Sequence, residues 1–304
     1  MTASKMHADE VQTDAALVRR LLAAQFPQWA DLPIEPVESG GTDNAIYRLG
    51  EQMAVRLPRL ERVTLQVEKE QRWLPVLAPL LPLAIPIPLG QGEPAEGYPL
   101  TWSVYPWPEG ENATTDQLAD PIEAARGLAE FVSALGRIDP DGGPAPGDHN
   151  FGRGIALARR DASTRKAIAE SEGLVDLEAV TAAWEADLHA PAWDGPPVWV
   201  HGDLQPGNLL ATDGRLSAVI DWGGLGIGDP AVDLLPAWNL FSGESREAFR
   251  AALGADGATW ARGRGWALST AITALPYYLD TNPAMVQMSR RVIDEVLADH
   301  APSD

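Results

Sequence analysis

Residues 201–208 read His-Gly-Asp-Leu-Gln-Pro-Gly-Asn, and residues 219–223 read Val-Ile-Asp-Trp-Gly. Short apolar runs flank the first stretch, and a Thr-Asp-Gly-Arg turn at 212–215 returns the chain toward it. We therefore expect the carboxylates of Asp203 and Asp221 and the amide of Asn208 to meet. Such oxygen groups suit Mg²⁺, and a carboxylate can also accept the proton of a hydroxyl group. Phosphoryl transfer requires these groups.

The composition narrows the classes of protein. The chain has 304 residues, enough for two parts with separate cores, and it lacks Cys, which excludes disulfides, thiolate metal sites and a Cys nucleophile. A net charge of -20 argues against a nucleic-acid partner. The same charge would attract a cationic substrate, although solubility alone also explains it.

Membrane and export signals are not visible in the sequence. No apolar run approaches the roughly 20 residues of a membrane helix. The first ten residues do not have the form of a signal peptide. We expect a cytoplasmic protein with no membrane partner; the sequence leaves open whether it is a monomer or a homodimer.

The periodicity changes along the chain from mostly strands to mostly helices. Before the catalytic stretch we expect a helix at 11–26, strands at 34–37, 45–49 and 53–58, a helix at 63–77, and strands at 85–89 and 98–105. Later we expect a helix at 116–138, capped by Thr114 or Thr115, and helices in three pieces within 154–187. After the catalytic stretch we expect a Gly-rich loop at 222–230, followed by helices at 231–241, 246–253, 260–278 and 283–297. This order predicts an α+β fold. Residues 1–105 form a small antiparallel-sheet N-lobe with a helix, residues 106–304 form a larger, mainly helical C-lobe, and a Pro-rich hinge lies at about 103–110.

Three blocks carry a family resemblance. Asn208 lies five residues after Asp203, and Asp221 lies eighteen after it, which is the order of the protein-kinase catalytic loop and metal-binding Asp. Residues 201–208 and 220–223, with Gly-Asp-Pro-Ala-Val-Asp-Leu at 228–234, resemble the aminoglycoside phosphotransferase family. The resemblance covers most of the chain. It implies a bilobal protein-kinase-like fold and an antibiotic-resistance kinase that moves the γ-phosphoryl of ATP or GTP to a small-molecule hydroxyl.

The resemblance also implies a role for each residue of the loop. Asp203 would orient the acceptor hydroxyl and take its proton, and Asn208 and Asp221 would hold Mg²⁺. His201 and Asp233 would support the loop. Gln205 would either support the loop or contact the substrate. The alternative for Asp203, Asn208 and Asp221 is that they only cap turns.

On the nucleotide side, the Gly-rich turn offers Gly40, Gly41, Thr42 and Asn44, whose backbone N–H groups could approach phosphates, although an ordinary hairpin turn looks the same. Kinases place a Lys in the third strand, paired with a helix Glu. Here the third strand offers Arg56, with Glu70 as the first-choice partner and Glu68 as the second. An Arg can bind phosphate bidentately, but Arg56 could also be a surface residue.

The base and acceptor contacts rest on the resemblance alone. Backbone groups near Ser103, Val104 and Tyr105 would contact the base. The acceptor site would lie in the helical lobe. Its candidate residues are Gln205, Trp238, Tyr277, Tyr278 and Asp280, with the carboxylates of Asp176, Glu178, Glu185 and Asp187 available for ammonium groups.

The acceptor stays open at this point. An aminoglycoside-like antibiotic is the first expectation, and a macrolide or a metabolite alcohol such as choline or homoserine is the alternative. A hypothesis of a different class is a catalytically idle nucleotide-binding protein. Arg56 in place of Lys motivates it, and the presence of Asp203, Asn208 and Asp221 argues against it.

Overall fold

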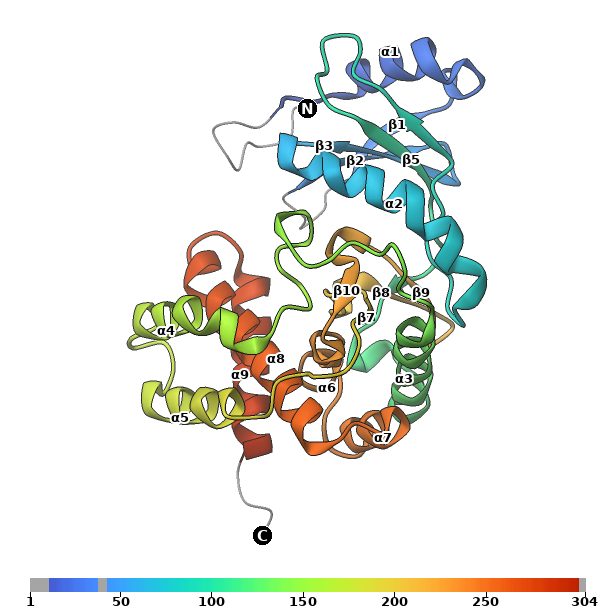
Figure 1. The fold of residues 1–304 in the computed structure, drawn as a ribbon. Coiled ribbons are helices and arrows are strands. Elements are labelled where there is room, and N and C mark those ends of the chain that lie inside the picture. Colours follow the sequence, from blue (N-terminus) through green and yellow to red (C-terminus); the bar gives the residue numbers. More distant parts are fainter. Residues whose placement is uncertain (1–10, 38–42, 301–304) are drawn as a thin grey trace. The chain divides into compact units, whose positions relative to one another are not determined.

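The chain folds into two compact units (Figure 1) in a computed structural model that describes residues 11–37 and 43–300. Unit 1 comprises Met1–Gly110 with Ala218–Gly223, and unit 2 comprises Glu111–Ser217 with Gly224–Asp304. The segment that carries Asp221 thus belongs to unit 1. In the described part of the chain, no helix is long and apolar enough to cross a membrane.

Unit 1 is built on one antiparallel sheet. Its strand order is β1 (Ile34–Val37), β2 (Asn44–Leu49), β3 (Met53–Pro58), β5 (Trp102–Pro106) and β4 (Gly90–Gly92). Side chains alternate between the two faces of each strand. Tyr47, Val55 and Val104 therefore share one face, where they join the buried side chains of helix α1 (Ala15–Gln25) in a common core.

The other face of the sheet turns its side chains toward helix α2 (Thr64–Leu77). Arg56 from β3 and Ser103 and Tyr105 from β5 lie on this face, and Figure 1 shows α2 running along the sheet. The polar residues of this face thus lie beneath a helix that itself carries Glu70.

One strand predicted in unit 1 is not formed, and another begins later than predicted. Residues 85–89 form no strand, because Pro86 and Pro88 lack the backbone N–H that a ladder needs. The short strand β4 follows them instead. The strand predicted at 98–105 begins only at Trp102, after a turn that joins Ala95 and Tyr98.

Unit 2 is mainly helical. Its helices are α3 (Pro121–Arg137), α4 (Asp161–Glu170), α5 (Leu177–Leu188), α6 (Pro236–Asn239), α7 (Gly243–Leu253), α8 (Gly257–Tyr278) and α9 (Pro283–His300). Helix α8 packs against α4, α5 and α9, and α3 packs against α7. Strand β7 (Val198–Val200) pairs with β10 (Gly226–Gly228), and β8 (Leu209–Thr212) lies between β6 (Glu111–Asn112) and β9 (Arg215–Val219). The antiparallel sheet of unit 1 and the helices of unit 2 confirm the predicted α+β class.

Three details of unit 2 differ from the prediction. Helix α3 begins at Pro121, because the carboxylate of Asp120 accepts hydrogen bonds from the first backbone N–H groups, and Thr114 instead caps a separate short turn. The helix predicted at 231–241 is broken into a 3₁₀ segment, Pro230–Leu234, and the single turn of α6. The predicted loop at 222–230 contains strand β10, which is too short to show a strand pattern.

Candidate active site

Asp233 fixes the start of the loop of residues 201–208 in unit 2 through hydrogen bonds to its backbone. The two carboxylate oxygens of Asp233 accept hydrogen bonds from the backbone N–H of His201, at 2.7 Å, and of Gly202, at 2.6 Å. Burial raises the pKa of Asp233 to about 7, against the two backbone bonds, which lower it. His201 is fully buried, and its Nδ1 accepts the backbone N–H of Asp203 at 3.2 Å. Both residues therefore contact backbone groups of the loop.

The carboxylate of Asp203 is oriented by three side chains. Its Oδ2 accepts hydrogen bonds from Asn208 at 3.1 Å and from Gln205 at 3.2 Å. Its Oδ1 lies 3.3 Å from Nη2 of Arg153. The side chain is 27% exposed, so it is fixed by neighbours and is still open to solvent.

The amide of Asn208 is oriented so that it could bind a cation. Its Nδ2 donates to the backbone oxygen of Asp203 at 2.9 Å and to the Asp203 carboxylate. Both partners are acceptors, so the nitrogen must face them and the amide oxygen points elsewhere. A side-chain oxygen of this kind fits Mg²⁺. Within the described ranges, no cluster of three or more His, Cys, Asp or Glu side chains could hold a metal ion.

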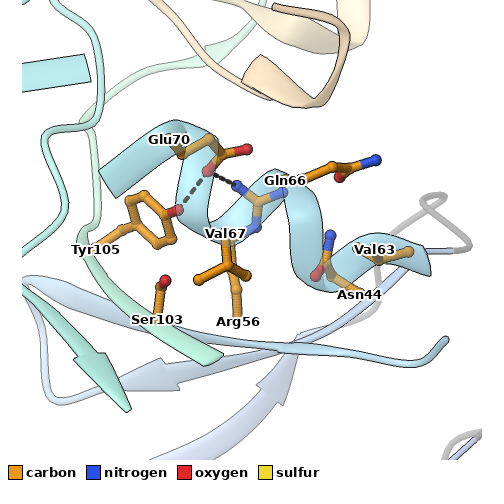
Figure 2. Close-up of a pocket in the computed structure, with 8 residues that line it drawn as sticks. All are labelled: Asn44, Arg56, Val63, Gln66, Val67, Glu70, Ser103 and Tyr105. Atoms are coloured by element: carbon orange, nitrogen blue, oxygen red, sulfur yellow. Dashed lines mark hydrogen bonds and ion pairs between the residues drawn. The ribbon is translucent and has the colours of Figure 1, made fainter. Parts of the chain in front are cut away.

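On the nucleotide side, in unit 1, Arg56 pairs with Glu70, as Figure 2 shows. Its Nη1 lies 3.1 Å from Oε2 of Glu70, which also accepts the hydroxyl of Tyr105. Glu68 is exposed, so Glu70 is the helix partner. Burial alone would lower the pKa of Arg56, but the nearby charges, first that of Glu70, raise it. The guanidinium is therefore a permanent cation.

A small pocket brings together five residues that the sequence suggested for the nucleotide. They are Asn44, Arg56, Glu70, Ser103 and Tyr105. The pocket has a volume of about 10 Å³, enough for roughly one water molecule and too small for a nucleotide. Val104 lies on the opposite face, and its carbonyl accepts the N–H of Leu89 at 2.8 Å. That carbonyl is therefore already hydrogen-bonded within unit 1.

The segment that carries Asp221 is attached to helix α2. Lys69 donates from Nζ to the carbonyl oxygen of Gly223 at 2.8 Å, and Asp221 Oδ1 lies 3.7 Å from Nη2 of Arg56. Asp221 has a φ of 60°, a left-handed conformation that Asp tolerates better than most residues. Its side chain is 50% exposed, so the carboxylate fits a role as a Mg²⁺ ligand.

Burial lowers the pKa of Lys69 to about 8, although the charges of Glu70 and Asp221 oppose the shift. Sequence reasoning did not single out this residue. A signal was present: the chain has only three lysines, Lys5, Lys69 and Lys166, among 23 basic residues.

The other predicted residues lie as follows. Gly40, Gly41 and Thr42 are outside the described residues. Trp238 is fully buried with its ring 4.7 Å from that of Trp260, whereas Tyr277 is 61% exposed and packs edge-on against Tyr278. Asp280 is exposed.

The carboxylates suggested for ammonium groups are mostly engaged within unit 2. Asp187 is fully buried and pairs with Arg264 at 2.8 Å. Glu185 pairs with Arg165, and Asp176 caps helix α5. Glu178 is exposed on α5.

A sheet unit with an Arg–Glu pair and a helical unit with a His-Gly-Asp loop define a kinase-like phosphotransferase. The model of the phosphotransferase enzyme family (APH) matches residues 33–266, and the chain belongs to this family. It is a small-molecule kinase that acts on hydroxyl groups. No curated protein sequence matches it.

Solved structures share the fold at low identity. A GDP complex of wild-type aminoglycoside 2'-phosphotransferase-IIIa is 19% identical, with a TM-score of 0.73, and the match covers 95% of this chain and 100% of that one. The macrolide 2'-phosphotransferase MphH from Brachybacterium faecium is 22% identical, with a TM-score of 0.62, covering 96% of this chain and 100% of that one. A streptomycin–ATP ternary complex of APH(2")-IIa is 21% identical, with a TM-score of 0.60, covering 86% of this chain and 91% of that one.

Proposed function

We propose that the protein transfers the γ-phosphoryl group of ATP or GTP to a hydroxyl of a small molecule, with Asp203 as the base. The observation that carries this proposal is the carboxylate of Asp203, which three side chains orient while 27% of the side chain stays exposed. A base must be fixed and must be reachable by the proton that it accepts.

The remaining roles divide between the two units. Asn208 and Asp221 would hold Mg²⁺, which supplies positive charge for the phosphates of the donor. Arg56, fixed by Glu70, would contact those phosphates. Solved relatives in complex with GDP and with ATP support a nucleotide donor and leave the choice between ATP and GTP to experiment.

For the acceptor we propose an antibiotic, with an aminoglycoside as the first candidate. Solved relatives in complexes with kanamycin and gentamicin support this choice. A macrolide is the second candidate, because the buried pair of Asp187 with Arg264 removes a carboxylate that a polycationic acceptor could use. Metabolite alcohols such as choline and homoserine complete the acceptors to be tested.

A turnover assay tests the proposal. The protein is incubated with Mg²⁺, with ATP or GTP, and with each acceptor, and release of the nucleoside diphosphate is measured. We expect acceptor-dependent release that disappears when Mg²⁺ is chelated. Nucleotide binding without release above background for any acceptor would instead favour the catalytically idle alternative. Expression in an antibiotic-sensitive host provides an independent measure of the acceptor class.

A further inference from the structure

Arg153 contacts the carboxylate of Asp203 from a segment outside the loop of residues 201–208. Protein-kinase catalytic loops read His-Arg-Asp, whereas this chain has Gly202 before its Asp. Gly202 has a φ of 82°. A Cβ at this position would lie 2.7 Å from Cβ of Arg153 and 2.8 Å from the carbonyl oxygen of Gly224. Any larger residue at position 202 would therefore clash with the first carbons of the Arg153 side chain.

Arg153 reaches Asp203 from a separate segment, 50 residues earlier in the chain. Its neighbours Gly152 and Gly154 have φ values of 66° and 82°, which glycine adopts readily. The side chain of Arg153 is 16% exposed, and Nη2 lies 3.3 Å from Oδ1 of Asp203. The backbone turn thus directs one guanidinium toward one oxygen of the carboxylate.

The position of Arg153 is unfavourable for stability in two ways. Burial, and to a smaller extent the charge of Arg153, lower the pKa of Arg160 to about 10. The two cations therefore lie close enough to repel each other. The Nε of Arg153 is also buried without a hydrogen-bond partner. Unpaired buried donors are uncommon in folded proteins and call for a specific reason. The contact with Asp203 supplies that reason.

We propose that Arg153 is a positioning residue that fixes the carboxylate of Asp203 for proton acceptance. The guanidinium holds Oδ1, while Gln205 and Asn208 hold Oδ2, so the carboxylate plane cannot rotate freely. This proposal rests on the proposed function, because it assumes that Asp203 receives the acceptor proton.

The test compares Arg153→Ala and Arg153→Lys with Arg159→Ala, a control that removes an exposed Arg six residues away. We expect Arg153→Ala to lower kcat about 100-fold, because a misplaced catalytic group loses this much, with the KM for nucleotide within about twofold of the parent. Arg153→Lys should recover part of the loss, since an ammonium keeps the charge and lacks the planar fork. Millimolar guanidinium chloride, but not sodium chloride, should partly restore Arg153→Ala.

A kcat for Arg153→Ala within twofold of the parent would overturn the proposal. If that variant does not fold, Arg153→Lys carries the test, and parental kcat in the lysine variant would overturn it instead. Failure of the parent protein to turn over any acceptor would reject the proposed function and not the contact. A crystal structure of whichever variant folds then decides: we expect the Asp203 carboxylate to rotate or to adopt several orientations, and an unchanged carboxylate would refute the role of Arg153.

Discussion

In unit 1, Arg56 pairs with Glu70 at 3.1 Å, and in unit 2, Arg153 pairs with Asp203 at 3.3 Å. The two pairs differ in whether the cation or the carboxylate is the more exposed partner. In unit 1 the carboxylate is 2% exposed and the guanidinium 17%, whereas in unit 2 the carboxylate is 27% exposed and the guanidinium 16%. In unit 1 the buried carboxylate thus supports a cation, and in unit 2 a partly buried cation supports a carboxylate.

This difference matches the chemistry that each proposed site requires. Phosphates need a fixed positive charge, so the Glu70 carboxylate can be buried once it is paired. A base needs an accessible oxygen, so Asp203 must stay partly in solvent while its orientation is fixed. An Arg–carboxylate pair can therefore suit either proposed role. The role depends on whether the cation or the carboxylate is the member that solvent reaches.

The largest expected effect is on the exposed carboxylate of unit 2. Asp203→Asn should lower kcat by about 10²–10⁴-fold, because an amide cannot accept the hydroxyl proton. The KM for nucleotide should change little, because Asp203 is proposed to contact the acceptor hydroxyl and Arg56 is proposed to contact the phosphates of the donor. Steady-state kinetics with the best acceptor measures both constants.

Asp213→Asn is the matched control for this substitution. Asp213 is exposed in the turn between β8 and β9 and has a φ of 51°, which Asn also tolerates. It should keep parental kinetics. Parental kcat in Asp203→Asn would reject Asp203 as the base and would remove the basis of the comparison between the two pairs.

A smaller effect is expected at Arg56, the partly buried cation of unit 1. Arg56→Ala should raise the KM for nucleotide about tenfold, which corresponds to about 1.4 kcal/mol of lost binding, and should leave Glu70 buried without its cation. Loss of one partner of a buried pair costs about 3–5 kcal/mol of stability; we expect the lower end, because Arg56 is partly exposed. Arg56→Lys should reduce both losses.

Kinetics and thermal unfolding together separate the two effects of Arg56→Ala. Arg72→Ala, which removes an exposed Arg from the same helix as Glu70, is the control. A loss of stability with an unchanged KM would mean that Arg56 only supports the fold of unit 1. The cation would then have no direct part in binding the donor.

The sequence predicted those parts of the site that are local in the chain. Asp203, Gln205 and Asn208 lie within six residues, and their contacts follow from the form of one loop. Asp233 also fits, because the resemblance included its motif. The Arg56–Glu70 pair followed from the kinase pattern of a third-strand cation with a helix Glu, which left Glu68 as the second choice.

The sequence did not predict contacts that depend on tertiary packing between distant segments. Arg153 meets Asp203 across 50 residues, and Lys69 meets Gly223 across 154. A periodicity pattern cannot show which charged residue of a helix is buried. The glycines on both sides of Arg153 and the scarcity of lysine were the available signals, and both acquire meaning only when the partners are known.

The smallest expected effect concerns the stability of unit 1 at alkaline pH. The pKa of Lys69 is about 8 in the folded state, against an ordinary value of 10.5. The unfolded chain therefore binds more protons between these two values, and the free energy of unfolding should rise with pH across this window. The difference in pKa corresponds to about 3 kcal/mol. The free energy of unfolding should be lower by this amount below pH 8 than at about pH 10.5.

Lys69→Met should lack this rise, and Lys166→Met, which removes a side chain that is 75% exposed, should keep it. Urea denaturation of the parent and both variants at pH 7 and pH 10 measures the difference, because the other titrating groups cancel between the proteins. Equal pH dependence in the parent and Lys69→Met would show that Lys69 is not held as a buried cation. Lys69→Met should also need more Mg²⁺ for half-maximal turnover, because it removes the bond to Gly223, two residues from Asp221. At pH 7, Lys69→Met should thus be more stable than the parent and should also require more Mg²⁺. This combination is expected if Lys69 positions Asp221 and does not stabilise the fold.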